Sequence, residues 1–186
     1  MTIDDVLSEG REKMDKAVAV ARDDFSGVRS GRAAPALIER LNVDYYGSAT
    51  PLQSLASISV PESRQLMVSV YDQNAVGAVE KAIRNSDLGL NPNTEGNAIR
   101  LNFPQLTGER RKDLVRLVRH KAEEGRIAIR NIRQGAKKEM EALESAGEIS
   151  EDELRRGEKK LQEVTDAHTG EVDAMLRNKE QELLED

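Results

Sequence analysis

Hydrophobic and small residues recur at alternating spacings of three and four along residues 3–28. This repeat is typical of a helix with one narrow apolar seam, packed as in a coiled coil. Thr2 directly precedes the repeat and is suited to cap the helix. Because so narrow a seam does not support a lone helix in water, the pattern predicts partner helices. The seam residues are Ile3, Leu7, Gly10, Met14, Ala17, Ala21, Phe25 and Val28.

A second, longer amphipathic pattern runs from Thr107 to about Gly147. We expect one helix of about 40 residues there, about 60 Å long at 1.5 Å per residue, with Thr107 as its cap. Its predicted core face comprises Leu114, Leu117, Val118, Ala122, Ile129, Ile132, Ala136, Met140 and Leu143. The side predicted to lie opposite, here called the basic stripe, comprises Lys112, Arg116, Arg119, Arg126, Arg130, Arg133 and Lys137, interrupted by Glu123.

A third helix is predicted after a short connection at residues 145–149, so it should run back antiparallel to the second. Ser150 with Glu153 forms a capping-box pattern, and Ile149 with Leu154 forms a hydrophobic staple. A near-heptad seam continues to Leu183. The three helices should therefore pack as one antiparallel bundle. The third seam contains Leu154, Gly157, Leu161, Val164, His168, Val172 and Met175.

The pattern changes between residues 32 and 104, where short β-prone runs are separated by Gly, Pro and Asn. Strands are expected at 37–38, 41–46, 54–60, 66–70 and 98–103. One helix fits residues 73–85, with Asp72 as its cap and Val76, Val79 and Ile83 on its buried side. Of the adjacent Tyr45 and Tyr46, one should lie in the core. These residues predict a small, β-rich α/β domain inserted between the first two helices.

The expected fold class is thus α+β, a long three-helix bundle with an inserted domain. The bundle should be discontinuous, residues 1–30 plus 106–186, and the insert should span 31–105. Glycine and proline punctuate both crossings between them, which favours a hinge at Ser30, Gly31, Pro104 and Gln105.

Charge is distributed unevenly along the 186 residues, whose formal net charge is −6. Residues 107–141 carry 11 Lys and Arg against 6 Asp and Glu, a local net charge of +5. Basic stripes on long helices are usually solvated faces with i,i+4 partners. Here few partners occur within the helix and arginine predominates, and its planar guanidinium suits phosphate. We therefore favour nucleic-acid binding by this stripe.

Signals for catalysis are lacking, so we expect no enzyme, cofactor or metal site. The sequence has no cysteine, and the histidines, His120 and His168, fall in different helices; His168 should be packed in its seam and His120 solvated. Aromatic residues make up only 3% of the chain, which argues against stacking of single-stranded bases. No apolar run is long enough for a membrane and no presequence pattern occurs, so a cytoplasmic protein is expected. We also expect a monomer.

Five segments, in the same order, resemble the bacterial ribosome recycling factor family across essentially the whole chain. They are residues 28–33 (VRSGRA), 43–52 (VDYYG and TPL), 82–92 (AIRNSDLGLNP), 104–112 (PQLTGERRK) and 129–133 (IRNIR). The chain departs from that family's usual pattern at Gln134, where another basic residue is common, and at Gly125 and Gly135, which are rare there.

The resemblance implies an L-shaped molecule close to transfer RNA in outline. It implies splitting of the post-termination ribosome together with elongation factor G, the partner that would push the inserted domain. It also implies that the bundle lies against large-subunit ribosomal RNA. Matched motif by motif, the RNA-binding residues would be Arg29, Arg32, Arg111, Arg130 and Arg133.

Two rival functions remain open at this stage. One is a coiled-coil adaptor that binds proteins, not RNA, through the basic stripe; salt dependence of RNA binding separates the two. The other is an enzyme with its site in the insert, for which a deep polar pocket would be evidence.

Overall fold

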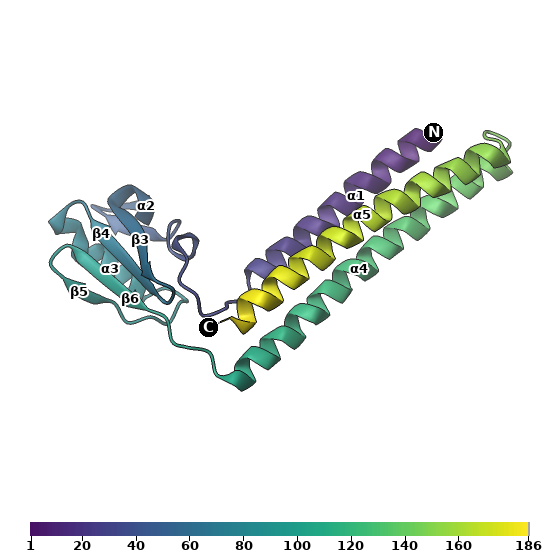
Figure 1. Ribbon diagram of the computed structural model, residues 1–186. Helices are drawn as coiled ribbons and strands as arrows, with labels where there is room; N and C mark the ends of the chain where they lie inside the picture. Colours follow the sequence, from purple (N-terminus) through teal and green to yellow (C-terminus); the bar gives the residue numbers. More distant parts are fainter. Residues whose placement is uncertain (186) are drawn as a thin grey trace. The chain divides into compact units, whose positions relative to one another are not determined.

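The computed structural model describes residues 1–185 and divides the chain into two compact units. One unit joins Met1–Arg29 to the segment that begins at Gly108, and the other is Ser30–Thr107. The first unit is a bundle of three helices, α1 (Ile3–Ser26), α4 (Gly108–Ser145) and α5 (Glu151–Leu184). Figure 1 shows the three side by side, with α1 and α5 both antiparallel to α4. The predicted α+β class and three-helix bundle are confirmed.

Side-chain caps define where two of these helices begin. The Asp5 amide donates to Thr2 Oγ1 and the Thr2 amide donates to Asp5 Oδ2, so Thr2 closes a capping box at α1. Ser150 and Glu153 do the same at α5. Both predicted caps are confirmed, and each satisfies two amides that the first helical turn leaves unpaired.

The turn between α4 and α5 is closed by Gly147, whose φ of 72° lies in the left-handed region. The Gly147 amide donates to the Glu144 carbonyl at 2.8 Å and the Glu148 amide to the Leu143 carbonyl at 2.9 Å. These two bonds form a Schellman motif, which ends α4 and sends the chain back along it.

The bundle core follows most of the predicted seams, with corrections in α1 and α4. In α1 the predicted Leu7 and Ala17 are only half-buried, whereas their neighbours Val6 and Val18 are buried. Leu117 was placed on the core face but is 42% exposed, whereas Val115 is buried at 8%. At 100° per residue, Val115 lies about 50° from the centre of the buried face and Leu117 about 110°. Buried side chains in the bundle include Val6, Met14, Val18, Phe25, Val118, Ala122, Ile129, Met140, Leu161 and Val172.

The two interior glycines of α4 occupy different environments. A Cβ on Gly125 would meet Ala21 Cβ at 3.4 Å and Val172 Cγ atoms at 3.8 Å, so this glycine lies in the packed interior between helices. A Cβ on Gly135 would have nothing within 4 Å. Gly125 therefore allows close packing of the helices, whereas Gly135 faces open space.

The second unit is built on a four-stranded antiparallel sheet of order β3-β4-β6-β5. The strands are β3 (Ala56–Glu62), β4 (Gln65–Val70), β5 (Asn93–Glu95) and β6 (Ala98–Asn102), and β1 (Asn42–Tyr45) pairs with β2 (Ser48–Pro51) as a separate hairpin. Short helical segments complete it: η1 (Pro35–Leu37), α2 (Leu52–Leu55), η2 (Gln73–Ala75) and α3 (Val76–Arg84).

One apolar core holds the insert together. Val76, Val79 and Ile83 of α3 are buried, as predicted, and join the buried side of the sheet. Asp72 caps the segment as expected, because the Asn74 amide donates to its side chain at 2.9 Å. The rest of the buried core is Ile38, Val43, Leu52, Ala56, Leu66, Val68, Val70, Ala75, Leu90, Ile99 and Leu101.

Several strand predictions in the insert need correction. The strand expected at 37–38 is wrong, since Leu37 ends the 3-10 turn that Pro35 opens. The segment 54–60 begins with the end of α2 and is extended only from Ala56. The strands β2 and β5 were missed because they are short and carry mostly polar residues.

The β1–β2 hairpin resolves the question of the paired tyrosines. Tyr46 and Gly47, with φ of 50° and 81°, form the two-residue turn. Tyr46 is 79% exposed, while Tyr45 packs against the core and donates its hydroxyl to Asp72 Oδ2 at 3.0 Å. One of the two tyrosines is therefore a core residue, as expected.

Candidate nucleic-acid interface

The basic stripe lies beside the core face of α4, not opposite it. At 100° per residue its centre is about 100° from the centre of the buried face. Arg126 and Arg133 lie nearest the bundle and are half-buried, whereas Arg130 is exposed. The edge of the stripe therefore runs along α5.

Carboxylates of α5 pair with several of these cations. Arg119 binds Glu180, Arg126 Nη2 lies 2.6 Å from Asp173 Oδ1, and Lys137 Nζ lies 3.4 Å from Glu158 Oε1. The expectation of few partners is wrong even within α4, where other carboxylates pair with Arg116, Arg126, Arg130 and Lys137. All these ion pairs neutralise part of the stripe, and the spacing along α4 alone could not reveal the pairs with α5.

Glu123 divides its two oxygens between two arginines. Its Oε1 lies 2.5 Å from Arg130 Nη2 and its Oε2 lies 3.1 Å from Arg126 Nη1. The Arg130 guanidinium, followed by that of Arg126, holds the pKa of Glu123 below its usual value. Because an exposed ion pair is weak in water, Arg130 can exchange this carboxylate for a phosphate at small cost.

Arg133 belongs to the basic stripe and has a neutral partner on α5. Its Nη1 donates to Gln162 Oε1 of α5 at 3.2 Å. Within residues 1–185, no carboxylate oxygen lies within 4.0 Å of its guanidinium. Gln162 is neutral, so Arg133 is oriented by the bundle while it keeps its full positive charge.

The other predicted RNA-binding arginines lie elsewhere along the chain. Arg111 is half-buried in the first turn of α4, about 28 Å along the helix from Arg130 at 1.5 Å per residue. Arg29 ends the first segment of the bundle unit and is exposed, whereas Arg32 is half-buried in the insert unit. Arg130 and Arg133 lie about one helical turn apart on α4.

The four predicted hinge residues, Ser30, Gly31, Pro104 and Gln105, all fall within the insert unit. Gly31 has a φ of 78°, and a Cβ there would lie 3.2 Å from Leu106 Cγ and 3.4 Å from the Pro104 carbonyl oxygen. The two linkers therefore touch each other at this point.

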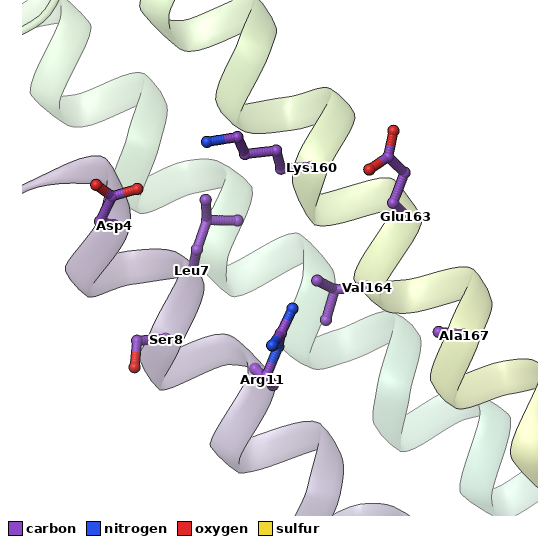
Figure 2. A pocket seen from close by; sticks show the side chains of 8 residues that line it. All are labelled: Asp4, Leu7, Ser8, Arg11, Lys160, Glu163, Val164 and Ala167. Atoms are coloured by element: carbon purple, nitrogen blue, oxygen red, sulfur yellow. The ribbon is translucent and has the colours of Figure 1, made fainter.

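A groove between α1 and α5 was not singled out by the sequence (Figure 2). It has a volume of about 420 Å³ and apolar walls that include Leu7 and Val164. Its rim carries both signs of charge, with carboxylates at Asp4 and Glu163. Such a rim repels phosphate as much as it attracts it, so the groove does not suit RNA. The remaining lining residues are Ser8, Arg11, Lys160 and Ala167.

Neither histidine offers a catalytic arrangement. His168 is 6% exposed in the bundle core, as predicted, and His120 is a solvated residue of α4 whose Nε2 lies 3.3 Å from Glu124 Oε1. In the part of the chain that the structure describes, no group of three or more His, Asp or Glu side chains is arranged to hold a metal ion. No helix among residues 1–185 is long and apolar enough to cross a membrane.

A family model described as ribosome recycling factor matches residues 21–184. This chain belongs to the ribosome recycling factor family. The ribosome-recycling factor of Saccharopolyspora erythraea is 52% identical over 183 residues, covering 98% of this chain and 99% of the relative. That of a Parafrankia species is 53% identical over 182 residues, covering 98% of each. The resemblance seen in the five motifs is confirmed.

Solved structures of ribosome recycling factors share the fold. A solution structure of a ribosome recycling factor is 43% identical, matches with a TM-score of 0.80 and covers 99% of this chain and 98% of the other. A second structure is 48% identical, with a TM-score of 0.67 and full coverage of both chains. It contains the T. thermophilus ribosome recycling factor and E. coli elongation factor G bound to the E. coli post-termination complex.

Proposed function

We propose that this member of the family splits the post-termination ribosome together with elongation factor G, and that it binds large-subunit ribosomal RNA through the basic stripe. Family membership supports the first part, as does the T. thermophilus factor described with elongation factor G on a post-termination complex. One observation carries the second part. Arg133 is oriented by a neutral partner, one turn from an exposed Arg130, and retains a charge that no described carboxylate neutralises.

Arginines at this spacing suit the backbone of folded RNA. A guanidinium offers paired donors to phosphate oxygens, and such contacts position a protein without reading sequence. RNA helices are recognised mostly by shape and backbone, which a straight, 38-residue helix can follow. The bundle would therefore dock as a rigid body, and Arg29, Arg32 and Arg111 would add phosphate contacts elsewhere on the chain.

The mechanism requires no chemistry by this chain. We propose that elongation factor G supplies nucleotide hydrolysis in the cytoplasm, that it moves the insert, and that the bundle transmits the force to the contact between subunits. The bundle unit and the insert unit would then have separate tasks, binding and response to the partner.

The direct test measures ribosome binding and subunit splitting separately for Arg133→Gln. Losing one charge-assisted hydrogen bond should weaken binding by about 1–3 kcal/mol, which is a factor of about 5 to 150. Thermal stability should change little, because the lost partner is a single exposed amide. Arg155→Gln is the matched control, because it removes the same charge from a site outside the stripe. The Arg155 side chain is 71% exposed on α5.

The results of the binding and splitting assays distinguish the proposed function from the adaptor function. Equal binding of R133Q and the parent protein would remove Arg133 from the interface. Splitting that proceeds without elongation factor G would contradict the shared mechanism. Salt-insensitive binding to protein partners, with no binding to ribosomal RNA, would instead favour the adaptor function.

A further inference from the structure

The turn between β1 and β2 holds a tyrosine in a backbone conformation that favours glycine or asparagine. Tyr46 has a φ of 50°, the one positive φ of a non-glycine residue among residues 1–185. Left-handed backbone crowds the Cβ of an L residue, so a bulky side chain is strained there. Asn-Gly is the pair that two-residue turns of this kind favour. The backbone of the turn therefore gives no reason for an aromatic side chain at position 46.

Internal packing explains this tyrosine no better. The Tyr46 side chain is 79% exposed, and its ring meets the ring of Tyr45 edge-on, with centroids 4.6 Å apart. Tyr45 is itself fixed, because its hydroxyl donates to Asp72 Oδ2 at 3.0 Å. Edge-to-face contact orients the Tyr46 ring but leaves most of it in water. The insert thus presents an ordered aromatic ring to solvent.

A third tyrosine adjoins the same carboxylate. Tyr71 directly follows β4 and directly precedes Asp72, and its side chain is 69% exposed. Its amide donates to the Leu55 carbonyl at 3.0 Å, so its backbone is held. The chain has three tyrosines in all, and Asp72 links them. We call Tyr45, Tyr46 and Tyr71 the tyrosine cluster.

The carboxylates beside the tyrosine cluster keep their negative charge. Asp44 Oδ1 accepts from the Gly47 amide at 3.0 Å, and Asp72 anchors the cluster as described. Among residues 1–185, no Lys, Arg or His nitrogen lies within 4.0 Å of either carboxylate. The arginines nearest in sequence, Arg40 and Arg64, precede β1 and β4, whereas the tyrosines lie at the other ends of these strands. The cluster therefore lies in an anionic part of the insert.

This combination suits a guanidinium group. An arginine stacks on the face of a tyrosine ring, and a carboxylate nearby supplies the opposite charge. Tyrosine and arginine are also the residues that most often dominate protein–protein contacts. Phosphate, in contrast, is repelled by Asp44 and Asp72, which disfavours RNA at this surface.

We propose that the tyrosine cluster is the surface by which the insert binds an arginine side chain of its protein partner, with Tyr46 stacking on the guanidinium and Asp44 and Asp72 supplying the counter-charge. The proposal rests on the proposed function for the identity of that partner, elongation factor G. Arginine recognition itself can be tested without ribosomes.

An NMR titration of the full chain with the peptide acetyl-Arg-Gly-Arg-Gly-amide provides that test. The largest shift changes should centre on Tyr46 and Gly47. Tyr46→Asn should weaken binding about two- to fivefold, the loss of one exposed cation–π contact, whereas Tyr46→Phe should retain it. Asp44→Asn should also weaken binding, although its amide oxygen can still accept from the Gly47 amide. Val20→Asn, at a residue 60% exposed on α1, is the matched control and should bind as the parent does.

The variant Y46N should fold as well as the parent protein. Asparagine relieves the strain of the turn and so offsets the lost ring contact, and the melting temperature should stay within about 2 °C. Shift changes spread over other acidic surfaces, with none at Tyr46, would overturn the proposal. Larger changes at Tyr46 with hexauridylate than with the arginine peptide would also overturn it, and would identify a base-stacking surface instead.

Ribosome assays then separate this proposal from the proposed function. Y46N should bind ribosomes as the parent does when elongation factor G is absent. The concentration of elongation factor G that gives half-maximal splitting should rise at least about twofold. An unchanged requirement for elongation factor G, or an equal loss of ribosome binding, would contradict the assigned partner. If the parent protein failed to split ribosomes, the proposed function would fail while the titration still judged arginine recognition.

Discussion

At the scale of single residues, the backbone environment of each glycine decides what a methyl group would do. Gly135 sits on an exposed, right-handed turn of α4 with open space where a Cβ would be. Gly147, at the end of the same helix, needs a φ of 72° to close the Schellman motif. Position 135 can therefore accept a residue with a Cβ, whereas position 147 requires a left-handed backbone that favours glycine.

The same substitution at these two positions should therefore change stability in opposite directions. Gly135→Ala should raise the free energy of unfolding by about 0.5–1 kcal/mol, because alanine loses less backbone entropy in a helix. Gly147→Ala should lower it by about 1–2 kcal/mol, the cost of left-handed backbone for a residue with a Cβ. Urea unfolding of both variants decides this, and a loss of stability in G135A would show that its surroundings are not open.

His168 makes stability depend on pH. Its Nδ1 lies 2.7 Å from the Val164 carbonyl and its Nε2 lies 2.7 Å from Asp15 Oδ1, so only the doubly protonated ring satisfies both acceptors. Burial alone would lower the pKa of His168, but the Val164 carbonyl and the Asp15 carboxylate, with Glu171 nearby, outweigh burial and raise it above 6.5.

A raised pKa in the folded state gives stabilisation that is complete below the unfolded value of 6.5 and is lost as pH rises through the folded value. The melting temperature should therefore fall as pH rises above about 6.5, the ordinary value for histidine. His168→Gln should flatten this part of the profile. An identical slope in the parent protein and H168Q would assign the dependence to other groups.

At the scale of the helix, burial is set by where α1 and α5 meet α4. Leu161 of α5 is 2% exposed, in keeping with its seam, but Leu117 of α4 is 42% exposed although its spacing seemed to include it. The apolar stripe of a helix is only about 100° wide, so an error of one residue moves a side chain out of it.

Two leucine truncations should separate core from surface. Leu161→Ala should lower the free energy of unfolding by about 2–5 kcal/mol, as large-to-small core changes do. Leu117→Ala should lower it by less than about 1 kcal/mol, since much of that side chain is already in water. Chemical denaturation measures both, and similar losses would mean that Leu117 packs against the bundle after all.

At the scale of the whole molecule, a net charge of −6 coexists with a stripe of seven cations. The net charge opposes general attraction to RNA, so the proposed RNA binding depends on how that face is presented. Glu123 and the α5 carboxylates reduce the positive charge that the stripe offers to phosphate, because each ion pair occupies one of its cations.

This arrangement predicts that removing one carboxylate strengthens binding. Glu123→Gln should increase affinity for ribosomal RNA several-fold at 50–100 mM salt, because Arg126 and Arg130 lose a competing anion. Affinity should fall as salt rises, and R133Q should reduce the slope of log K against log salt by about 0.7–0.9. Binding titrations at four salt concentrations measure both quantities. An unchanged slope in R133Q would mean that Arg133 contacts no phosphate.

The sequence alone was sufficient for the three helices, the caps of α1 and α5, the inserted β-rich unit and the family. These features depend on local signals: periodicity, Thr2 and Ser150 at helix starts, and ordered motifs. The short polar strands β2 and β5 escaped detection because cross-strand partners, and not their own composition, make them strands.

Only the tertiary structure decided which cations of the stripe pair with carboxylates of α5 and which have a neutral partner. The partners Asp173, Glu180 and Gln162 lie between 29 and 61 residues away along the chain, so their match with α4 depends on helix register. The tie between the linkers has the same origin. Gly31 and Leu106 lie at the two ends of the insert's sequence and approach each other in the folded unit. The sheet between them in the chain has a strand pairing that no local pattern specifies. The periodicity of the sequence determines which residues share a face of a helix. Contacts between distant segments determine which residues of that face are left without a carboxylate partner.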